Sequence, residues 1–587
     1  MPFPAADGVF VAIEEDLSVG IFFLEIFYYL LHLLEADSIL SRSDPYVYFL
    51  YHLDLPISLG MIYLSDETGK IVIKHMKMVS RMDPLEILVH RLVRVTSSEE
   101  LQSVKFQVCG EFGLEEVPGN AELIAAARRV LHGDELSAVL KLLKRKPSRS
   151  QSGVAVVAVM TSPEGCPHGK CIVCPGGPDS DFYSPQSYTG REPAALRGIR
   201  HDYSPYEQVS GRLEQYHAIG HHTDKVDLII MGGTFPARDL GYQRDFVKGC
   251  LDALNGLESS SLEDSIRENE TAPNRCIGLT VETRPDHCGP EELDNMLSYG
   301  TTRVELGVQS VNDKILVKMG RGHGVRETVE ATERCKDRGL KVCYHIMPGL
   351  PGSSPEEDLR GFREIFSDQR FMPDMIKIYP TLVVEGTELH RMWKRGEYEP
   401  LSTPEAAELI ARMKALIPPY VRIQRVQRDI PSPIIEAGVV NSNLRQYVWD
   451  EMEKKGLVCR CLRCREAGRA LPVPEDVDLI HREYSASGGV EHFFELGDGE
   501  TMVAYARLRM KDGIPPTIRE LRVVGHMTPL DTSSIHLQHS GYGNRLLEVC
   551  EEFASGVIRV TSGIGVREYY RQRGYELRGP YMVKNLP

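Results

Sequence analysis

The chain has 587 residues, too many for one hydrophobic core, so two to four domains are expected. Hydrophobic residues make up 42% and charged residues 26%, as in ordinary soluble globular proteins. The formal net charge of -15 excludes a protein that is basic all over, though not one with a local basic face for nucleic acid. Six of the 13 cysteines fall in two tight clusters, which indicates metal or redox chemistry in a reducing, cytoplasmic compartment and excludes a disulfide framework.

Residues 1–85 form an atypical, apolar N-terminal segment. Leu17–Leu34 is almost wholly apolar and long enough to suggest a membrane span. However, Glu25 falls in its middle, where an acid costs about 3 kcal/mol on the insertion scale. No Lys or Arg precedes Arg42, so the basic region of a signal peptide is absent. A buried helix or a start codon placed too far upstream explains the segment better, and no stable membrane association is favoured.

Residues 86–150 are predicted to be helical. Helix formers recur at helical spacing over Ala121–Leu131 and Leu136–Leu143, and Gly133-Asp134 breaks the pattern between them. The second helix leads into five cations: Lys141, Lys144, Arg145, Lys146 and Arg149. They are either a solvated helix end, where cations are favoured, or a phosphate-binding face for RNA. This stretch alone favours neither interpretation.

Residues 151–440 alternate short apolar strands with helical patterns such as Val325–Arg338. The predicted strands are Val154–Met160, Val226–Met231, Cys276–Thr283, Arg303–Val308, Val342–Met347 and Met375–Tyr379. This alternation predicts an α/β fold with a parallel sheet, and six units suggest a partial (βα)6 barrel. The site of such a barrel lies at the C-terminal ends of its strands.

Glycines and polar residues gather at those strand ends. The second predicted strand is followed by Gly232-Gly233-Thr234, and the third by Glu282-Thr283-Arg284-Pro285. The fourth ends in Glu305-Leu306-Gly307-Val308-Gln309-Ser310, and the fifth is followed by Pro348-Gly349-Leu350-Pro351-Gly352. Any one of these could be an ordinary turn. Their repeated position indicates a site.

The loop after the first strand reads Cys166-Pro-His-Gly-Lys-Cys171-Ile-Val-Cys174. Three thiolates can hold three irons of a 4Fe–4S cluster, and the fourth iron can then bind a small molecule. Zinc is the alternative, but a closed zinc site needs four ligands and usually draws on two separated pairs. His168 could be a fourth ligand, although it lies where the loop is tight. The spacing favours the cluster.

A second cysteine group, Cys459-Arg-Cys461-Leu-Arg-Cys464, lies in the predicted linker 441–479. Its spacing supplies three soft ligands for a structural zinc that would pin the barrel to the last domain. Free thiols are the alternative. The fourth ligand is not evident, and His481 is one guess.

The last domain, residues 480–587, begins with the predicted strands Thr501–Met510 and Ile518–Val524. Gln538-His-Ser-Gly541-Tyr-Gly543 then opens the apolar helix Asn544–Phe553, and backbone N–H groups at such a start can cradle a pyrophosphate. With the later Tyr569-Tyr570-Arg-Gln-Arg-Gly574-Tyr575, the combination resembles the acetyl-coenzyme A site of GNAT-type acetyltransferases. The link from Glu552 to Ile558 is shorter than in that family.

The cysteine loop followed by Gly232-Gly233 resembles the radical S-adenosylmethionine (radical SAM) enzymes. Four further stretches resemble the catalytic subunit of Elongator in its single-chain archaeal or bacterial form: Cys174-Pro-Gly-Gly-Pro-Asp-Ser-Asp-Phe182, Gln186-Ser-Tyr-Thr-Gly190, Lys377-Ile-Tyr-Pro-Thr-Leu382 and Arg425-Val-Gln-Arg-Asp-Ile-Pro431. The resemblance covers roughly residues 100–587 and not residues 1–85.

The resemblance implies carboxymethylation at carbon 5 of the wobble uridine of tRNA. S-adenosylmethionine would be cleaved at the cluster, and the radical would take hydrogen from the acetyl methyl group of acetyl-coenzyme A before carbon adds to the base. The implied catalytic residues are Lys225, Tyr379 and Tyr570. The implied cofactor-binding residues are Gly232, Gly233, Glu282, Lys225 at the mouth of the second strand, Glu520, Leu521, Arg522, Val523, Gly541, Tyr542, Gly543 and Tyr570.

The implied cofactors are the 4Fe–4S cluster, S-adenosylmethionine and zinc, with acetyl-coenzyme A as co-substrate. The implied partners are the tRNA anticodon loop, held by residues 86–150, and an electron donor; a homodimer is one possible assembly. Reading the anticodon fits RNA recognition in which loop bases are splayed into a pocket. Two other classes stay open: a protein lysine acetyltransferase with a structural iron–sulfur cluster, and an RNA-binding scaffold without catalysis.

Overall fold

The structure, a computed structural model, describes residues 57–65, 71–80, 83–114, 116–144, 153–427, 430–468, 472–525 and 541–587. The chain divides into two compact units, Met1–Leu143 and Lys144–Pro587. We describe each unit by itself.

The described residues of the first unit include four helices with a shared apolar core, which confirms the helical prediction for residues 86–150. They are α2 (Pro84–Leu92), α3 (Ser98–Phe112), α4 (Asn120–Val130) and α5 (Gly133–Leu143). A capping box begins α3: the Ser97 side chain accepts from the Glu100 backbone, and the Glu100 side chain accepts from the Ser97 backbone. Leu88, Leu123 and Leu140 belong to the core that the helices share.

A hairpin precedes these helices, in a segment for which the sequence predicted no strand. β1 (Ile57–Ser65) pairs antiparallel with β2 (Ile71–Ser80). The apolar stretch Leu17–Leu34 lies outside the described residues. Within the part of the chain that the structure describes, we find no helix with the length and hydrophobicity of a membrane span.

The second unit begins with a seven-stranded parallel sheet in the order β10-β8-β7-β6-β5-β4-β3. All six predicted strands are present, and a seventh, β10, was not predicted. The bounds are β3 (Ala155–Met160), β4 (Lys225–Met231), β5 (Arg275–Thr283), β6 (Arg303–Gln309), β7 (Lys341–Ile346), β8 (Met375–Ile378) and β10 (Arg422–Arg425). The curled sheet is the partial barrel that the sequence predicts.

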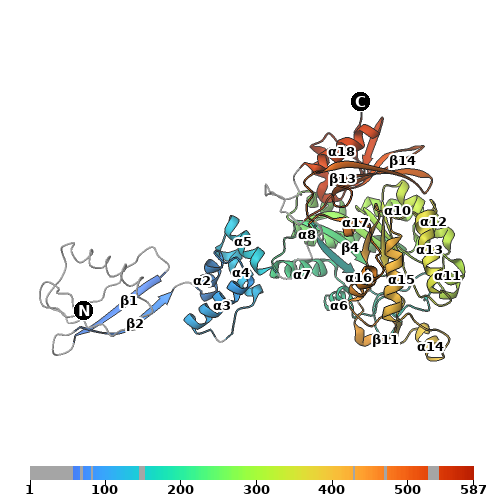
Figure 1. The fold of residues 1–587 in the computed structure, drawn as a ribbon. Coiled ribbons are helices and arrows are strands. Elements are labelled where there is room, and N and C mark those ends of the chain that lie inside the picture. Colours follow the sequence, from blue (N-terminus) through green and yellow to red (C-terminus); the bar gives the residue numbers. More distant parts are fainter. Residues whose placement is uncertain are drawn as a thin grey trace. The chain divides into compact units, whose positions relative to one another are not determined.

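Helices connect the strands of this sheet, and most of them cover its outside (Figure 1). They are α6 (Pro193–Arg200), α7 (Pro205–Ala218), α8 (Leu240–Asn255), α9 (Leu262–Asn269), α10 (Pro290–Ser298), α11 (Asp313–Met319), α12 (Val325–Asp337), α13 (Pro355–Ser367), α14 (Glu388–Lys394) and α15 (Thr403–Ala415). Strand and helix side chains form one large core, which includes Val157, Leu228 and Leu251. The strands are therefore buried, and their C-terminal ends are fixed relative to one another.

A short connecting region follows the barrel. β9 (Val383–Val384) pairs with β11 (Ile435–Ala437), and α16 (Leu444–Lys454) and α17 (Leu462–Arg465) come next. Leu462 N–H donates to the carbonyl of Val421 beside β10, and Ala467 N–H donates to the carbonyl of Met502 in the last domain. This segment therefore bonds to both domains.

In the last domain, the described strands form a mixed seven-stranded sheet in the order β12-β13-β14-β15-β16-β18-β17. Its elements are β12 (Asp478–Ala486), β13 (Gly489–Gly497), β14 (Met502–Lys511), β15 (Ile514–Val523), α18 (Tyr542–Phe553), β16 (Val557–Val560), α19 (Arg567–Arg571), β17 (Glu576–Arg578) and β18 (Tyr581–Asn585). A link of three residues joins α18 to β16. The predicted order of partial barrel and mixed α/β domain is confirmed.

Candidate active site

The cysteine loop leaves the C-terminal end of β3 and is held by its own polar contacts. The N–H of Cys166 donates to Gln186 Oε1, and Gln186 Nε2 donates to the Gly169 carbonyl at 3.2 Å. The N–H of Ser187 donates to Cys174 Sγ at 3.1 Å. Gln186 and Ser187 therefore hold two of the three cysteines from the opposite side of the loop.

The three thiols line one cavity, together with Gly233 and Arg321. Burial raises the pKa of Cys174 to about 11, so the free thiol is protonated at neutral pH and a metal must displace its proton. Arg321 Nη1 donates to Cys171 Sγ at 3.7 Å. His168 Nε2 lies 3.2 Å from Cys171 Sγ, within hydrogen-bond distance of that sulfur. Three soft ligands on one loop fit an iron–sulfur cluster with one open iron.

The loop after β4 requires glycine at two positions. Gly232 has φ +134, and a Cβ there would meet Thr161 Oγ1 at 2.0 Å. Gly233 has φ +91, and its Cβ would lie 3.9 Å from Cys166 Sγ. The backbone therefore approaches the cysteine loop closely, as the resemblance implies for the residues that receive the amine of S-adenosylmethionine.

The cavity that the cysteines line is also bordered by a buried network of charged groups. Lys377 Nζ contacts Glu305 Oε2 closely and lies 3.9 Å from Glu282 Oε1. His345 Nε2 lies 2.9 Å from Glu305 Oε2, and Tyr188 donates to Glu282 Oε2 at 2.6 Å. Burial raises the pKa of Glu305, but Lys377 and His345 lower it more, so the pKa lies well below its usual range. Glu305 is therefore a buried carboxylate with fixed partners.

The cavity has a volume of about 650 Å³ and is strongly basic. Nine arginines and Lys377 line it against four carboxylates, so it suits a polyanionic substrate. Its lining reaches Arg463 of α17 and Arg522 of β15. One cavity thus borders the cysteine loop, the connecting segment and the last domain.

Sequence reasoning assigned no individual role to several lining residues, which include Glu305, Gln309, Arg321, His345 and Lys377. Glu305 and Gln309 belong to the stretch that closes the fourth predicted strand, and Lys377 begins one of the stretches that resemble Elongator. Gln309 has φ +68, a conformation that a non-glycine residue seldom adopts, and no sequence pattern signals it. The pairing of residues from different strands depends on the register of the sheet, which the sequence does not specify.

Three residues assigned to chemistry lie in different parts of the unit. Tyr379 lines the cavity, and its ring packs edge-on to His345 at 5.4 Å. Lys225 is the first residue of β4, at the end of the strand opposite Gly232, and it is buried, which lowers its pKa. Tyr570 is buried in the core of the last domain between Tyr569 and Tyr575. Their catalytic roles stay predictions.

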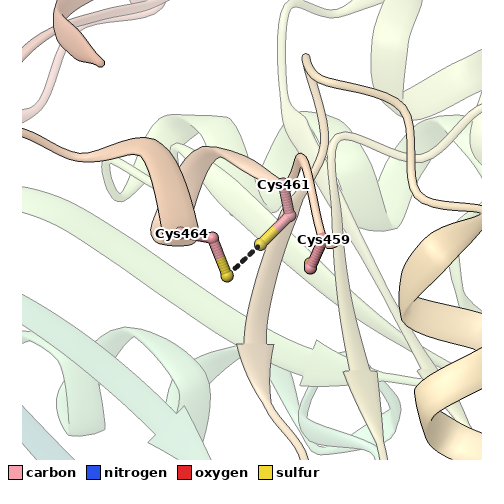
Figure 2. Close-up of side chains that lie close together, drawn as sticks. All are labelled: Cys459, Cys461 and Cys464. Atoms are coloured by element: carbon pink, nitrogen blue, oxygen red, sulfur yellow. Dashed lines mark hydrogen bonds between the residues drawn. The ribbon is translucent and has the colours of Figure 1, made fainter. Parts of the chain in front are cut away.

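The second cysteine group forms a compact triangle (Figure 2). The sulfur atoms of Cys459, Cys461 and Cys464 all lie within 4.8 Å of one another. Cys461 Sγ is 3.6 Å from Cys464 Sγ. Such a set suits a single zinc ion. His481, our guess for a fourth ligand, belongs instead to a separate group with Glu483 and His492, because its strand β12 places it on the sheet of the last domain.

The residues proposed to bind acetyl-coenzyme A lie near the middle of the last sheet. Within the described residues, β15 pairs with β16 only at Thr517 and Ile518. The Glu520–Val523 part of β15 therefore extends beyond its paired region with β16. The Glu520 side chain accepts from Tyr505 and Arg507 at 3.0 Å each. Burial raises the pKa of Glu520, but Arg507 and Lys341 lower it more, and the carboxyl stays ionised.

The glycine-rich helix start is present at α18. Gly541 takes the left-handed conformation with φ +83 immediately before Tyr542, and a Cβ at Gly543 would meet the Tyr569 hydroxyl at 3.2 Å. Residues 526–540, with the beginning of that motif, lie outside the described residues. Backbone N–H groups at such a start are suited to a phosphate group.

Of the five predicted RNA-binding cations, two are described. Lys141 is exposed on α5, and Lys144 follows the helix, partly buried, with its pKa lowered by burial. Arg145, Lys146 and Arg149 lie outside the described residues. The RNA-binding role of this group stays a prediction.

Comparison with known proteins identifies the family. The ELP3 N-terminal domain matches residues 85–151, the Radical SAM superfamily residues 160–362, and the Radical SAM C-terminal domain residues 373–454. The tRNA uridine(34) acetyltransferases of Methanocaldococcus infernus and Methanocaldococcus jannaschii are 51% and 50% identical; each alignment covers 80% of this chain, and 92% and 90% of those relatives. Human Elongator complex protein 3 is 42% identical over 83% of this chain and 93% of its own.

A solved structure agrees with this assignment. The Methanocaldococcus infernus Elp3 with an N-terminal deletion of residues 1-46 is 46% identical, with a TM-score of 0.66, and the match covers 74% of this chain and all of that one. Membership of the radical SAM superfamily implies a 4Fe–4S cluster and S-adenosylmethionine as cofactors. The chain is a radical SAM enzyme and belongs to the family of Elongator complex protein 3 and the archaeal tRNA uridine(34) acetyltransferases.

Proposed function

We propose that this protein modifies the wobble uridine of tRNA by carboxymethylation at carbon 5, with acetyl-coenzyme A as the carbon source. The observation that carries the proposal is the single basic cavity bordered by Cys166, Cys171 and Cys174 and by Arg522 of β15. Radical formation and thioester binding can therefore meet in one place.

The barrel residues would hold and orient the cofactors. Cys166, Cys171 and Cys174 would ligate the cluster, and Gly232 and Gly233 would let the backbone approach the amine of S-adenosylmethionine. When bound, this cofactor pair supplies a 5′-deoxyadenosyl radical.

The basic lining would hold the nucleic acid. Arginines such as Arg425 and Arg463 line the cavity, and arginine can bind phosphate groups in a bidentate manner. Phosphate contacts position a nucleic acid without reading its sequence, so the base itself must be recognised within the cavity. Lys141, Lys144, Arg145, Lys146 and Arg149 would add contacts to more distant phosphates.

The last domain would bind acetyl-coenzyme A at Glu520–Val523 and at the start of α18. The lysine acetyltransferase alternative needs a general base near the thioester. Glu520 is a poor base there, because its carboxylate is tied to Arg507 and its pKa is lowered. We therefore favour a uridine of bound tRNA as the acceptor over a protein lysine.

The Cys459, Cys461 and Cys464 group would hold a structural zinc. Leu462, within the group, bonds to the barrel, and Ala467, just after the group, bonds to the last domain, so the ion would fix the joint between them. We also propose that the protein is cytoplasmic, that a separate electron donor reduces its cluster, and that it forms a homodimer.

The test is an anaerobic reaction of cluster-reconstituted protein with acetyl-coenzyme A, S-adenosylmethionine and bulk tRNA. Nucleoside mass spectrometry should detect carboxymethyluridine, and chromatography should detect 5′-deoxyadenosine. Cys171→Ala should abolish both products together with the cluster absorbance. Cys288→Ala, which removes a buried thiol far from the loop in sequence, should retain both. Modified nucleoside formed equally by Cys171→Ala would contradict the proposal.

A further inference from the structure

Two histidines and a glutamate meet on the edge of the last sheet. β12 is an edge strand and pairs antiparallel with β13. Glu483 lies opposite His492 in the register, and His481 lies opposite Phe494. Side chains two residues apart on a strand share a face, so His481, Glu483 and His492 all project from the same face of the sheet.

Their ligand atoms are close enough to share one ion. His481 Nε2 is 3.1 Å from His492 Nδ1, and His492 Nδ1 is 3.7 Å from Glu483 Oε2. One ligand atom of each residue lies within 4.8 Å of the others. Because zinc binds nitrogen and oxygen at about 2.0–2.2 Å, two ligands of one ion stand up to about 4 Å apart. Both measured separations fall within that span.

Aromatic side chains hold the group in place. His481 stacks on Phe494 with ring centroids 4.8 Å apart, and Phe553 packs edge-on to His481 at 5.0 Å. His492 is buried, whereas His481 and Glu483 are exposed. The ligands are therefore fixed on one side by packing and open to solvent on the other, where an ion can enter and water can complete its coordination.

We propose that His481, Glu483 and His492 form a binding site for a divalent transition-metal ion. Two imidazoles and one carboxylate suit zinc, nickel or ferrous iron better than calcium or magnesium, which prefer oxygen ligands. The site contains no sulfur and is thus chemically distinct from the Cys459 group. Phe553 ends α18 and Tyr542 begins it, so the site lies about 16 Å along that helix from the proposed phosphate cradle.

A bound ion would tie the edge strand β12 to β13. An edge strand has a neighbour on one side only and is prone to fray or to pair with other chains. An ion that binds the folded edge but not the unfolded chain would stabilise the folded edge by mass action. The proposal does not depend on the function proposed above, because neither acetyl-coenzyme A nor tRNA enters it.

The test uses the full chain with its cluster and resident metals in place and Ni²⁺ as the probe. Equilibrium dialysis measures affinity and stoichiometry, and X-ray absorption at the nickel edge separates imidazole and oxygen ligands from sulfur. The wild type should bind one Ni²⁺ with nitrogen and oxygen ligands. Both His481→Asn and Glu483→Gln should weaken that binding by more than about tenfold. Both replaced side chains are exposed, so both variants should fold.

Two control variants match these changes. His90→Asn removes an exposed histidine on α2, and Glu576→Gln removes an exposed glutamate on β17 of the same sheet; both should bind Ni²⁺ like the wild type. No Ni²⁺ bound by the wild type, nickel with sulfur ligands, or equal affinity in His481→Asn and Glu483→Gln would each overturn the proposal.

Discussion

Glu305 and Lys377 form a buried ion pair that lines the same cavity as the cysteine loop. Glu305 has no exposed surface and Lys377 only 7%. Burial lowers the pKa of Lys377, but Glu305 raises it more, so the lysine stays charged. Each charge is stable in this place only because the other is present. The pair thus fixes two side chains where the substrate must bind.

We predict that Lys377→Met lowers the stability of the barrel by about 3–5 kcal/mol, because it leaves Glu305 buried without its closest partner. Trp393 lies on α14 and Trp449 on α16, which packs against α15 of the barrel, so tryptophan fluorescence during denaturation reports this transition.

The matched control is the double variant Glu305→Gln/Lys377→Met. A neutral amide needs no counter-charge, so the double variant should regain part of the stability that the single variant loses. A double variant less stable than Lys377→Met would show that the two side chains do not depend on each other.

At the scale of elements, the turns after the parallel strands build the site. The cysteine loop follows β3, Gly232-Gly233 follows β4, and Glu282 and Glu305 belong to β5 and β6. Because the strands are parallel, these turns all emerge at the same end of the sheet. The conformation of each turn therefore decides whether its side chains reach the cavity.

Gly232→Ala tests one of these turns. The new methyl group would have to adopt a φ that L-residues rarely take and would meet Thr161 Oγ1 at 2.0 Å. We expect the variant to lose S-adenosylmethionine binding, measured by equilibrium dialysis, and to be destabilised by roughly 3 kcal/mol.

Gly256→Ala is the comparison. Gly256 ends α8 with φ +74 but has open space where a Cβ would stand, so the change costs only about 1–2 kcal/mol and should leave binding intact. Equal loss of binding in both variants would mean that general destabilisation, and not the turn, is responsible.

The sequence predicted the elements with strong periodicity and missed those that depend on distant partners. The six apolar strands and the helices α4 and α5 follow from their patterns. β10 was missed because its four residues, Arg-Ile-Gln-Arg, contain a single apolar side chain. One of its arginines, Arg422, is nevertheless buried, where it pairs with Glu466. The contacts of Lys377 with Glu305 depend on the register of the sheet, which no local pattern encodes.

At the scale of the whole second unit, a buried layer of charges joins the barrel to the last domain. Arg519 of β15 donates to both carboxylate oxygens of Asp374, at 2.6 and 2.8 Å, and to Glu491 Oε2 at 2.7 Å. Lys336 of α12 lies 3.8 Å from Asp374 and 3.7 Å from Glu491. Asp374 precedes β8, the strand of Lys377, and Arg519 precedes Glu520, so this layer couples the two halves of the proposed site.

We predict that Arg519→Leu destabilises the unit by about 3–5 kcal/mol, because two carboxylates lose their buried partner. Trypsin should also cleave the variant faster than the wild type between the barrel and the last domain, since their joint would open more often.

Arg578→Leu is the control for this change. Arg578 pairs with Glu576 at 3.2 Å on the surface, and both side chains are more than half exposed, so the loss should be below about 1 kcal/mol. Similar stability and proteolysis in the two variants would contradict a coupling role for the buried layer.

The central claim is that the carbon added to uridine comes from the acetyl methyl group after the barrel's radical removes one of its hydrogens. The direct measurement supplies acetyl-coenzyme A with three deuteriums on that methyl group, together with tRNA and S-adenosylmethionine. Mass spectrometry should find one deuterium in 5′-deoxyadenosine and two in the carboxymethyl group of the uridine. Deuterium-free 5′-deoxyadenosine, or an intact trideuterated acetyl group on a protein lysine without label in tRNA, would contradict the claim.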